Sequence, residues 1–192
     1  ELLTLTAGHD QIRDYDAAVA TFEAMRSGVP IIHQGVLWDA QHLTYGAPDL
    51  LVRSDILPFL FPDAITAEQA ATPAPDLGTP FHYLVVDIKF STLHLDPNGE
   101  LKNGGSAAAY KPQLYIYNRA LGRLQGHEPP HSLLLGRSWD QRVGGETLRG
   151  TSCLDRLAHI PQAGSLANKV PIAQAVEEST AWLRRARTEG AS

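Results

Sequence analysis

Cysteine is nearly absent from this chain, which has one, Cys153, among 192 residues. One cysteine cannot form an intramolecular disulfide, and it cannot build a cysteine-ligated zinc or iron–sulfur site. We expect Cys153 to be a small core residue. The absence of disulfides favours a reducing compartment, so we expect an intracellular protein of the cytoplasm, nucleus or nucleoid.

Long apolar runs and nucleotide-motor motifs are also absent. No run approaches the length of a membrane span, and nothing resembles a signal peptide, so we expect no membrane partner. No GxxxxGK[ST] sequence is present, which excludes an ATP motor built on that loop within this chain. The net charge of −5 argues against a generic polyanion binder.

The charges that are present are distributed unevenly. Residues 1–100 hold fourteen acidic against four basic side chains, whereas 111–156 hold seven basic against four acidic ones. An acidic part beside a basic part is compatible with a metal-dependent enzyme acting on phosphates, and it also arises by chance. The length predicts a single domain over 1–192. Because the chain starts at Glu1 rather than Met, we expect it to be a fragment of a longer polypeptide.

Periodicity and turn residues predict an α/β domain, a mixed sheet with helices packed on it. The expected elements are a helix over 10–28, strands over 29–38, 43–55 and 81–91, a helix over 106–126, a strand over 131–139 and a helix over 167–190. Residues 66–80 are expected to be a loop, 94–105 a hairpin-like insertion or mobile loop, and the region of Cys153 a short strand. Pro112 is expected in the first turn of its helix. In the last helix the residues expected to face inward are Ile172, Val176, Trp182 and Leu183.

Charged residues interrupt two of the predicted strands. Asp87 and Lys89 follow the apolar run 83–86, and because they are two apart they emerge on the same face. Asp49 follows Gly46 and Pro48 at the start of another buried strand. Gln113 and Tyr117 are four apart and share one face of the helix over 106–126.

These residue types suit phosphodiester hydrolysis. That reaction needs a hard divalent cation held by carboxylate oxygens, an attacking water, and positive charge where negative charge develops. Asp49 and Asp87 on neighbouring strands could bind Mg²⁺, with the backbone carbonyl of Ile88 as a third ligand. Lys89 could orient the water or help to deprotonate it. Burial favours its neutral amine and the two aspartates its charged form, so the sequence leaves that choice open.

In this order and on these elements, Gly46-x-x-Asp49, Asp87-x-Lys89 and Gln113-x-x-x-Tyr117 resemble the PD-(D/E)xK nuclease superfamily. The chain is most similar to the RecB-type branch, including CRISPR-associated RecB-like exonucleases, over roughly 10–139. Each motif alone is common, but all three together are much less so. Pro48 before Asp49 also fits the family pattern.

The resemblance implies a restriction-endonuclease-like αβββαβ core and a Mg²⁺- or Mn²⁺-dependent nuclease acting on DNA in repair, recombination or replication. It makes Asp49 and Asp87 metal ligands, Lys89 the catalytic lysine, and Gln113 and Tyr117 DNA-contacting or supporting residues. Such domains often work beside a helicase or other domain of the same polypeptide. The cysteines that bind an iron–sulfur cluster in some relatives are absent, so no such cluster is expected.

The chain departs from the family pattern before the first strand, where relatives usually carry a further Glu or His. Glu23 is the only acid in that part of the helix, unless the counterpart lies upstream of Glu1. His33 and Gln34 are other candidates for supporting the site. Lys111 and Arg119, with Arg123 on the same helix, are candidates for phosphate contact. The aromatic residues that could stack on bases are Tyr110, Tyr115 and Trp139.

Other interpretations remain open at this point. Asp87 and Lys89 could form a simple ion pair, Asp49 could be a turn residue, and Gln113 and Tyr117 could be ordinary helix surface. The chain could be a catalytically inactive nucleic-acid-binding or docking module of the same fold. A metal-dependent hydrolase of a small phosphate compound is less attractive, because no glycine-rich phosphate loop is present.

Overall fold

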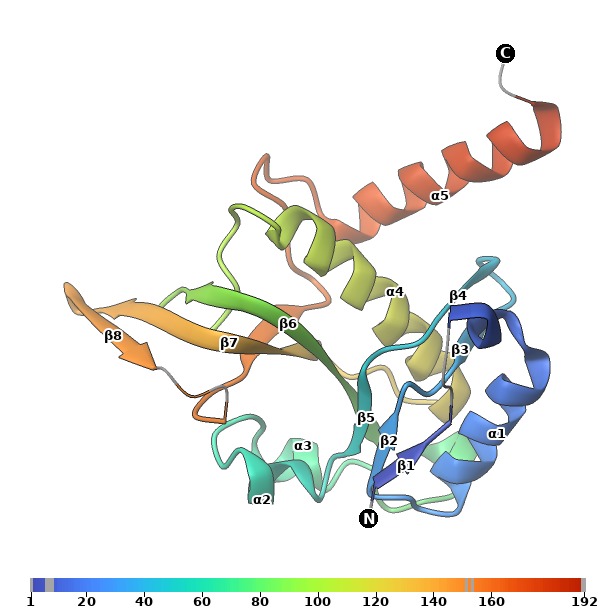
Figure 1. Cartoon of the computed structure of the whole chain (residues 1–192), viewed down its shortest axis with the longest axis horizontal. Helices are drawn as coiled ribbons and strands as arrows, with labels where there is room; N and C mark the ends of the chain where they lie inside the picture. Colours follow the sequence, from blue (N-terminus) through green and yellow to red (C-terminus); the bar gives the residue numbers. More distant parts are fainter. Residues whose placement is uncertain (1, 6–8, 151, 153, 191–192) are drawn as a thin grey trace.

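The computed structural model describes residues 2–5, 9–150, 152 and 154–190, and its centre is a seven-stranded mixed sheet (Figure 1). The strands follow the order β1-β2-β5-β6-β7-β8, and β9 also pairs with β7. They span Leu2–Thr4 (β1), Ile31–His33 (β2), Leu50–Arg53 (β5), Tyr83–Leu95 (β6), His131–Val143 (β7), Glu146–Gly150 (β8) and Ala158–Pro161 (β9).

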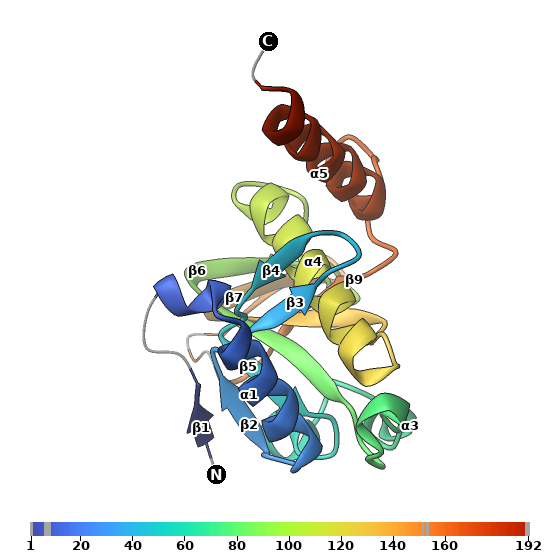
Figure 2. The same cartoon turned by 90° about the vertical axis from the view of Figure 1, so that its right-hand side faces the viewer.

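Helices cover both faces of this sheet, as Figures 1 and 2 show. On one face, α1 (Tyr15–Arg26) and α4 (Ala107–Gln125) pack against Tyr83 and Val85 in the larger apolar cluster. On the other, the segment carrying α2 (Leu57–Leu60) and α3 (Ala67–Ala70) packs against Leu84 and Val86 in a smaller cluster. The alternation of β6 residues between two cores explains why this strand is apolar on both faces.

The connections of the central strands determine where the charged residues lie. β2 and β5 are antiparallel, β5 and β6 are antiparallel, and β6 and β7 are parallel, joined through the 19-residue helix α4. A parallel pair needs such a crossover, whereas antiparallel neighbours do not. The predicted α/β class with a mixed sheet flanked by helices is confirmed.

Two predicted strands are each divided in the structure. Residues 29–38 bend at Gln34, whose φ of 52° is left-handed, and they form β2 and β3 (Leu37–Asp39). Residues 43–55 are interrupted at 47–49 and form β4 (Thr44–Gly46) and β5. β3 and β4 pair in a separate two-stranded sheet. Pro48 explains the second break, because proline cannot donate to a strand ladder.

The predicted loop over 66–80 contains structure. Thr66 and Gln69 form a reciprocal capping box that starts α3, and the 3-10 helix η2 spans Pro75–Leu77. The prediction was wrong here because proline and alanine content masked a T-x-x-Q capping signal. The insertion over 94–105 is hairpin-like as predicted, since Leu95 and Leu101 form an antiparallel bridge.

Two further expectations concern local positions. Pro112 lies inside α4 rather than in its first turn, because the helix already begins at Ala107. Cys153, with the short strand and the core position expected there, lies outside the described residues. Before it, β8 ends at Gly150, and after it β9 begins at Ala158. The remaining short element is the 3-10 helix η1 (His9–Arg13).

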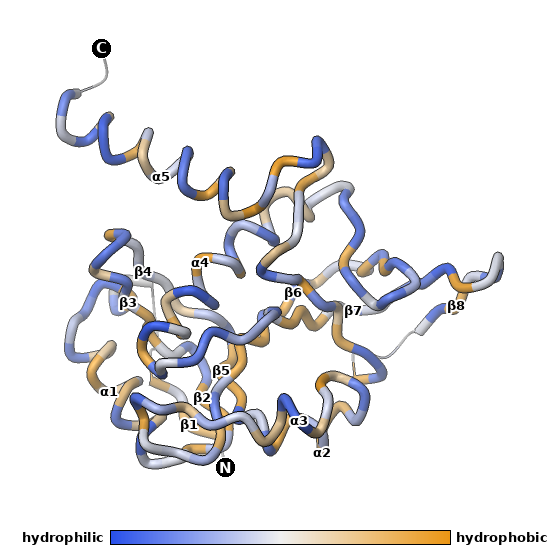
Figure 3. Tube along the Cα trace, turned by 180° about the vertical axis from the view of Figure 1, so that it is seen from behind, coloured by the Kyte–Doolittle hydropathy of each residue, from blue (hydrophilic) through white to orange (hydrophobic). Residues whose placement is uncertain are grey.

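The last helix, α5 (Ile172–Glu189), runs away from the body of the molecule in both views (Figures 1 and 2). Ile172 and Val176 near its start are buried as predicted, but Trp182 is 61% and Leu183 45% exposed. The inward prediction was therefore wrong for the later turns, which carry alternating polar and apolar residues (Figure 3). Among the described helices, none has the length and apolar character needed to cross a membrane.

Candidate active site

Asp49 and Asp87 meet at the point where β5 begins beside β6. Leu50 is opposite Val86 in the antiparallel register, so the preceding Asp49 lies next to Asp87. Asp49 Oδ2 accepts a hydrogen bond from the Ile88 backbone N–H at 2.7 Å, and the Asp49 N–H lies 3.4 Å from Asp87 Oδ1. The two carboxyl groups that the sequence placed on neighbouring strands are thus held together by the backbone.

Lys89 completes this cluster. Its Nζ lies 2.5 Å from Asp87 Oδ2, and the Lys89 side chain is 20% exposed whereas the Asp87 side chain is 4% exposed. Asp87 Oδ2 is buried and, apart from this ion-pair contact, has no hydrogen-bond partner among the described residues. An acceptor oxygen in that state is available to a further ligand, since buried acceptors are rarely left without one.

Burial and charge together set the protonation of these groups. Burial raises the pKa of Asp87 above its ordinary value, which Lys89 opposes and the charge of Asp49 reinforces. For Lys89, burial lowers the pKa, but the adjacent Asp87 and Asp49 outweigh burial and raise it. The two carboxylates therefore favour the charged form of the amine.

The helix residues Gln113 and Tyr117 lie beside this centre. Gln113 Nε2 donates to the Tyr117 hydroxyl oxygen at 3.0 Å. Burial raises the pKa of Tyr117, and the negative charges of Asp87 and Asp49 add to that effect. Because its oxygen accepts from Gln113, the phenol keeps its own proton to donate. These residues are therefore not ordinary helix surface.

The backbone carbonyl of Ile88 has a favourable position for the role expected of it. Extending the β5–β6 register by two residues puts Pro48 opposite Ile88. Alternate facing pairs of an antiparallel ladder exchange N–H and C=O bonds, and the Ser54 N–H to His82 carbonyl bond puts the Pro48–Ile88 pair in that set by alternation, but Pro48 has no N–H to give. The Ile88 N–H is bound by the Asp49 side chain instead, and its carbonyl points to the same edge of the strand.

The remaining predicted site residues lie elsewhere. Glu23 is exposed on α1, with its carboxylate 3.4 Å from Arg26 Nη1. Lys111 is buried, donates to Asn103 Oδ1 at 2.7 Å, and has its pKa lowered by burial. Within the described part of the chain, no contact brings either of them to the Asp49–Asp87 pair.

Arg119 is buried in an ion cluster rather than solvated. Its guanidinium pairs with Glu177 of α5 and lies 3.5 Å from Asp39 of β3. Arg123 approaches the same Asp39 carboxylate at 3.4 Å, and His42 lies 2.7 Å from it. Burial opposes the charge of Asp39, but these partners hold its pKa below the ordinary value. The cluster anchors α5 and the β3–β4 hairpin to α4.

The secondary candidates have mixed surroundings. The Gln34 N–H donates to the Asp49 carbonyl at 2.9 Å, so Gln34 supports the turn that carries Asp49. His33 Nδ1 lies 3.4 Å from Thr4 Oγ1. Tyr115 and Trp139 lie under the guanidinium groups of Arg119 and Arg156, respectively. Tyr110 is closer to the site, with its ring centre 5.3 Å from Lys89 Nζ.

The chain also contains the sequence His127-Glu128-Pro129-Pro130-His131, which matches the H-E-x-x-H zinc motif and was not identified from the sequence. That motif needs a helix to put both histidines on one face. Here α4 has already ended at Gln125. The His127 ring packs against His82 at 4.5 Å between centroids, and the His131 ring packs against His159 at 4.7 Å.

The donor set of the Asp49–Asp87 centre suits a hard divalent cation. Such ions prefer carboxylate and carbonyl oxygens, and this centre offers two carboxylates with the Ile88 carbonyl at the same edge. Among the described residues no group of three or more His, Cys, Asp or Glu side chains has the arrangement to hold a metal. Water would have to supply the other ligands, as is usual for Mg²⁺.

Comparison of the chain with protein-family models, with curated proteins and with solved structures gives no match in any of the three.

Proposed function

We propose that this chain is a divalent-metal-dependent nuclease domain that hydrolyses DNA phosphodiester bonds. One observation carries the proposal: Asp49 and Asp87 converge from adjacent antiparallel strands with the charged amine of Lys89 2.5 Å from Asp87. An ordinary surface ion pair would leave its carboxylate exposed. Asp87 is instead buried next to a second carboxylate, and both effects raise its pKa. Like-charge crowding of this kind is typical of functional sites.

The order of the central elements supports the same reading. The elements α1, β2, β5, β6, α4 and β7 follow one another as helix, three strands, helix and strand, with only the last pair of strands parallel. We interpret this as a restriction-endonuclease-like core, into which β3, β4, α2 and α3 are inserted. Asp49, Asp87 and Lys89 would then occupy the positions at which that fold carries its active site.

Each residue has a distinct task in this proposal. Asp49, Asp87 and the Ile88 carbonyl would hold Mg²⁺ or Mn²⁺, which supplies Lewis-acid polarisation of the scissile phosphate and activation of water. Lys89 would orient the attacking water and stabilise the negative charge that develops on the phosphate. Gln113, which donates to the Tyr117 hydroxyl oxygen, would hold the phenol in place beside the centre.

Cleavage assays test the proposal directly. The purified chain is incubated with Mg²⁺ or Mn²⁺ and labelled single- or double-stranded DNA, beside Asp87→Ala and the exposed-site control Asp63→Ala. We expect cleavage by wild type and Asp63→Ala, and its loss in Asp87→Ala and in EDTA. If wild type leaves all substrates intact, or Asp87→Ala cleaves as well as wild type, the proposal fails.

A second candidate is a catalytically inactive nucleic-acid-binding or docking module with the same fold. The observation that favours it is the small acid set, since Glu23 lies on the surface, paired with Arg26. Calorimetric titration with Mn²⁺ separates the two candidates. An inactive module is expected to show no binding heat that depends on Asp49 and Asp87.

A further inference from the structure

A pocket of about 360 Å³ lies beside Lys89, between β6 and the start of α4. It falls in the size range of small-molecule sites, about 300–1,000 Å³. Its lining includes Thr92 and His94 from β6, Lys102 and Asn103 from the insertion, and Tyr110 from α4. We call it the Tyr110 pocket.

Tyr110 connects this pocket to the candidate active site. Its ring lines the pocket and also lies 5.3 Å from Lys89 Nζ, measured to the ring centre. Thr92, which also lines the pocket, is three residues beyond Lys89 on the same strand. A ligand in the pocket would therefore lie one side chain away from the catalytic amine.

The lining of the pocket is suited to an anion. Its lining includes Lys102 and no carboxylate, although the chain carries a net charge of −5. His94 also lines it but is paired with Asp140 at 2.8 Å, and the Thr92 hydroxyl lies 2.7 Å from that of Ser138, so Lys102 is the group that faces an incoming anion. Lys102 is exposed, and among the described residues it makes no salt bridge that would neutralise it.

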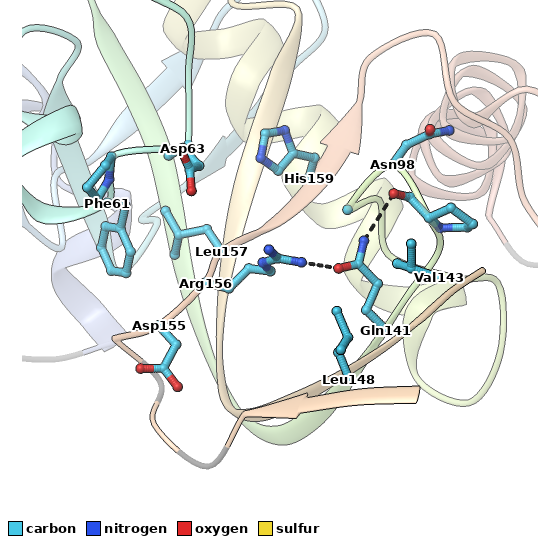
Figure 4. Close-up of a pocket in the computed structure, with 14 residues that line it drawn as sticks. Phe61, Asp63, Asn98, Gln141, Val143, Leu148, Asp155, Arg156, Leu157 and His159 are labelled. Carbon is cyan, nitrogen blue, oxygen red and sulfur yellow. Dashed lines mark hydrogen bonds between the residues drawn. The ribbon is translucent and has the colours of Figure 1, made fainter. Parts of the chain in front are cut away.

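Other pockets of the described chain differ in this respect. The pocket of about 420 Å³ in Figure 4 is lined by Asp63 and Asp155, and its Arg156 donates to Gln141. A third is lined by Glu68, and a fourth by Glu178. Of these pockets, the one whose lining suits an anion is also the one next to the candidate active site.

We propose that the Tyr110 pocket binds the nucleotide that flanks the scissile phosphate of a single-stranded DNA substrate; this inference rests on the proposed nuclease function. The base stacks on the Tyr110 ring, and Lys102 contacts the phosphate of the same nucleotide. Aromatic stacking of this kind tolerates every base. A base in a duplex is already stacked and paired, so entry favours a single strand.

Direct binding, measured without catalysis, tests the pocket. Fluorescence anisotropy follows a short fluorescein-labelled oligodeoxythymidine in EDTA, with wild type, Lys102→Ala, Tyr110→Ala and Tyr110→Phe. We expect Tyr110→Ala to weaken binding about tenfold, Lys102→Ala about threefold, and Tyr110→Phe little, because the ring is kept. The matched control is Lys169→Ala, an exposed lysine elsewhere on the chain. Thermal unfolding checks that each variant folds.

The outcomes separate the pocket from the nuclease activity. Wild type that binds through Lys102 and Tyr110 but never cleaves DNA upholds the pocket and removes the proposed function. Wild type that cleaves DNA, with Lys102→Ala and Tyr110→Ala binding as tightly as wild type, overturns the pocket alone. Equal weakening by Lys102→Ala and Lys169→Ala also overturns it, since binding would then be general electrostatic attraction.

Discussion

The ring of Tyr117 fills the space that a side chain at position 46 would need: a Cβ on Gly46 would lie 2.3 Å from Tyr117 Cε1. This contact gives Gly46 a physical reason to lack a side chain. It also links the turn before Asp49 to the helix that carries Gln113 and Tyr117. Two motifs that are far apart in the sequence are therefore in direct contact.

Replacing Gly46 by alanine is expected to displace Tyr117. The added methyl group has no room beside the ring, so we expect the free energy of unfolding to fall by about 1–3 kcal/mol. Cleavage should fall with it. Chemical denaturation measures the first and the DNA assay the second. Gly104→Ala is the control, because a Cβ there meets nothing within 4 Å. Unchanged stability of Gly46→Ala would contradict the contact.

Replacing Asp49 by asparagine separates metal binding from folding. The asparagine carbonyl still accepts the Ile88 N–H, and the variant loses one negative charge beside Asp87. We expect the heat of Mn²⁺ binding to disappear in calorimetry, while the free energy of unfolding stays within about 1 kcal/mol of wild type. Asp63→Asn should bind Mn²⁺ as wild type does. Retention of wild-type Mn²⁺ affinity by Asp49→Asn would remove Asp49 as a ligand.

Removal of Arg119 is expected to affect stability rather than DNA contact. Its loss removes one of the charged groups beside the buried Asp39 carboxylate, which keeps Arg123 and His42 as neighbours. We expect Arg119→Ala to lower the free energy of unfolding by about 3 kcal/mol, measured by urea denaturation. Arg137→Ala, at an exposed position on β7, should cost less than about 0.5 kcal/mol. If Arg119→Ala is as stable as wild type but binds DNA more weakly, Arg119 contacts DNA instead.

How far the sequence predicts this structure depends on the range of the interactions involved. The alternation of apolar residues along β6 and the position of Asp49 before a buried strand are local signals. Both predict the observed positions of Asp87 and Asp49. The surroundings of Lys111, Arg119 and Trp182, which differ from those predicted, depend on which elements pack together. Partners such as Asn103 and Glu177 are distant in sequence or lie on another element, so no spacing rule could find them.

The turn residues show the same limit. Gly28 and Gly126 end their helices with left-handed φ values of 78° and 70°, as their positions predict. The bend at Gln34 has no comparable signal, because a left-handed glutamine is uncommon and is imposed by its surroundings. The division of the predicted strand over 29–38 therefore could not be read from its letters.

The packed histidines predict a loss of stability in acid. Burial lowers the pKa of His82 and of His131 from the ordinary 6.5 to about 4, and their histidine neighbours add to this effect. Between these pH values the unfolded chain binds more protons than the folded one. The free energy of unfolding is therefore greatest above about pH 6.5 and declines as the pH falls toward 4.

The expected decline is on the order of 3 kcal/mol for each of these histidines. Urea denaturation at a series of pH values between these limits measures it. His131→Phe should flatten the acid limb, because a buried Nε2 that has no hydrogen-bond partner among the described residues is replaced by a ring that cannot titrate. His94→Gln alters an exposed histidine paired with Asp140 and should leave most of the slope in place. A wild-type curve that is flat over this range would show that the folded state takes up these protons without penalty.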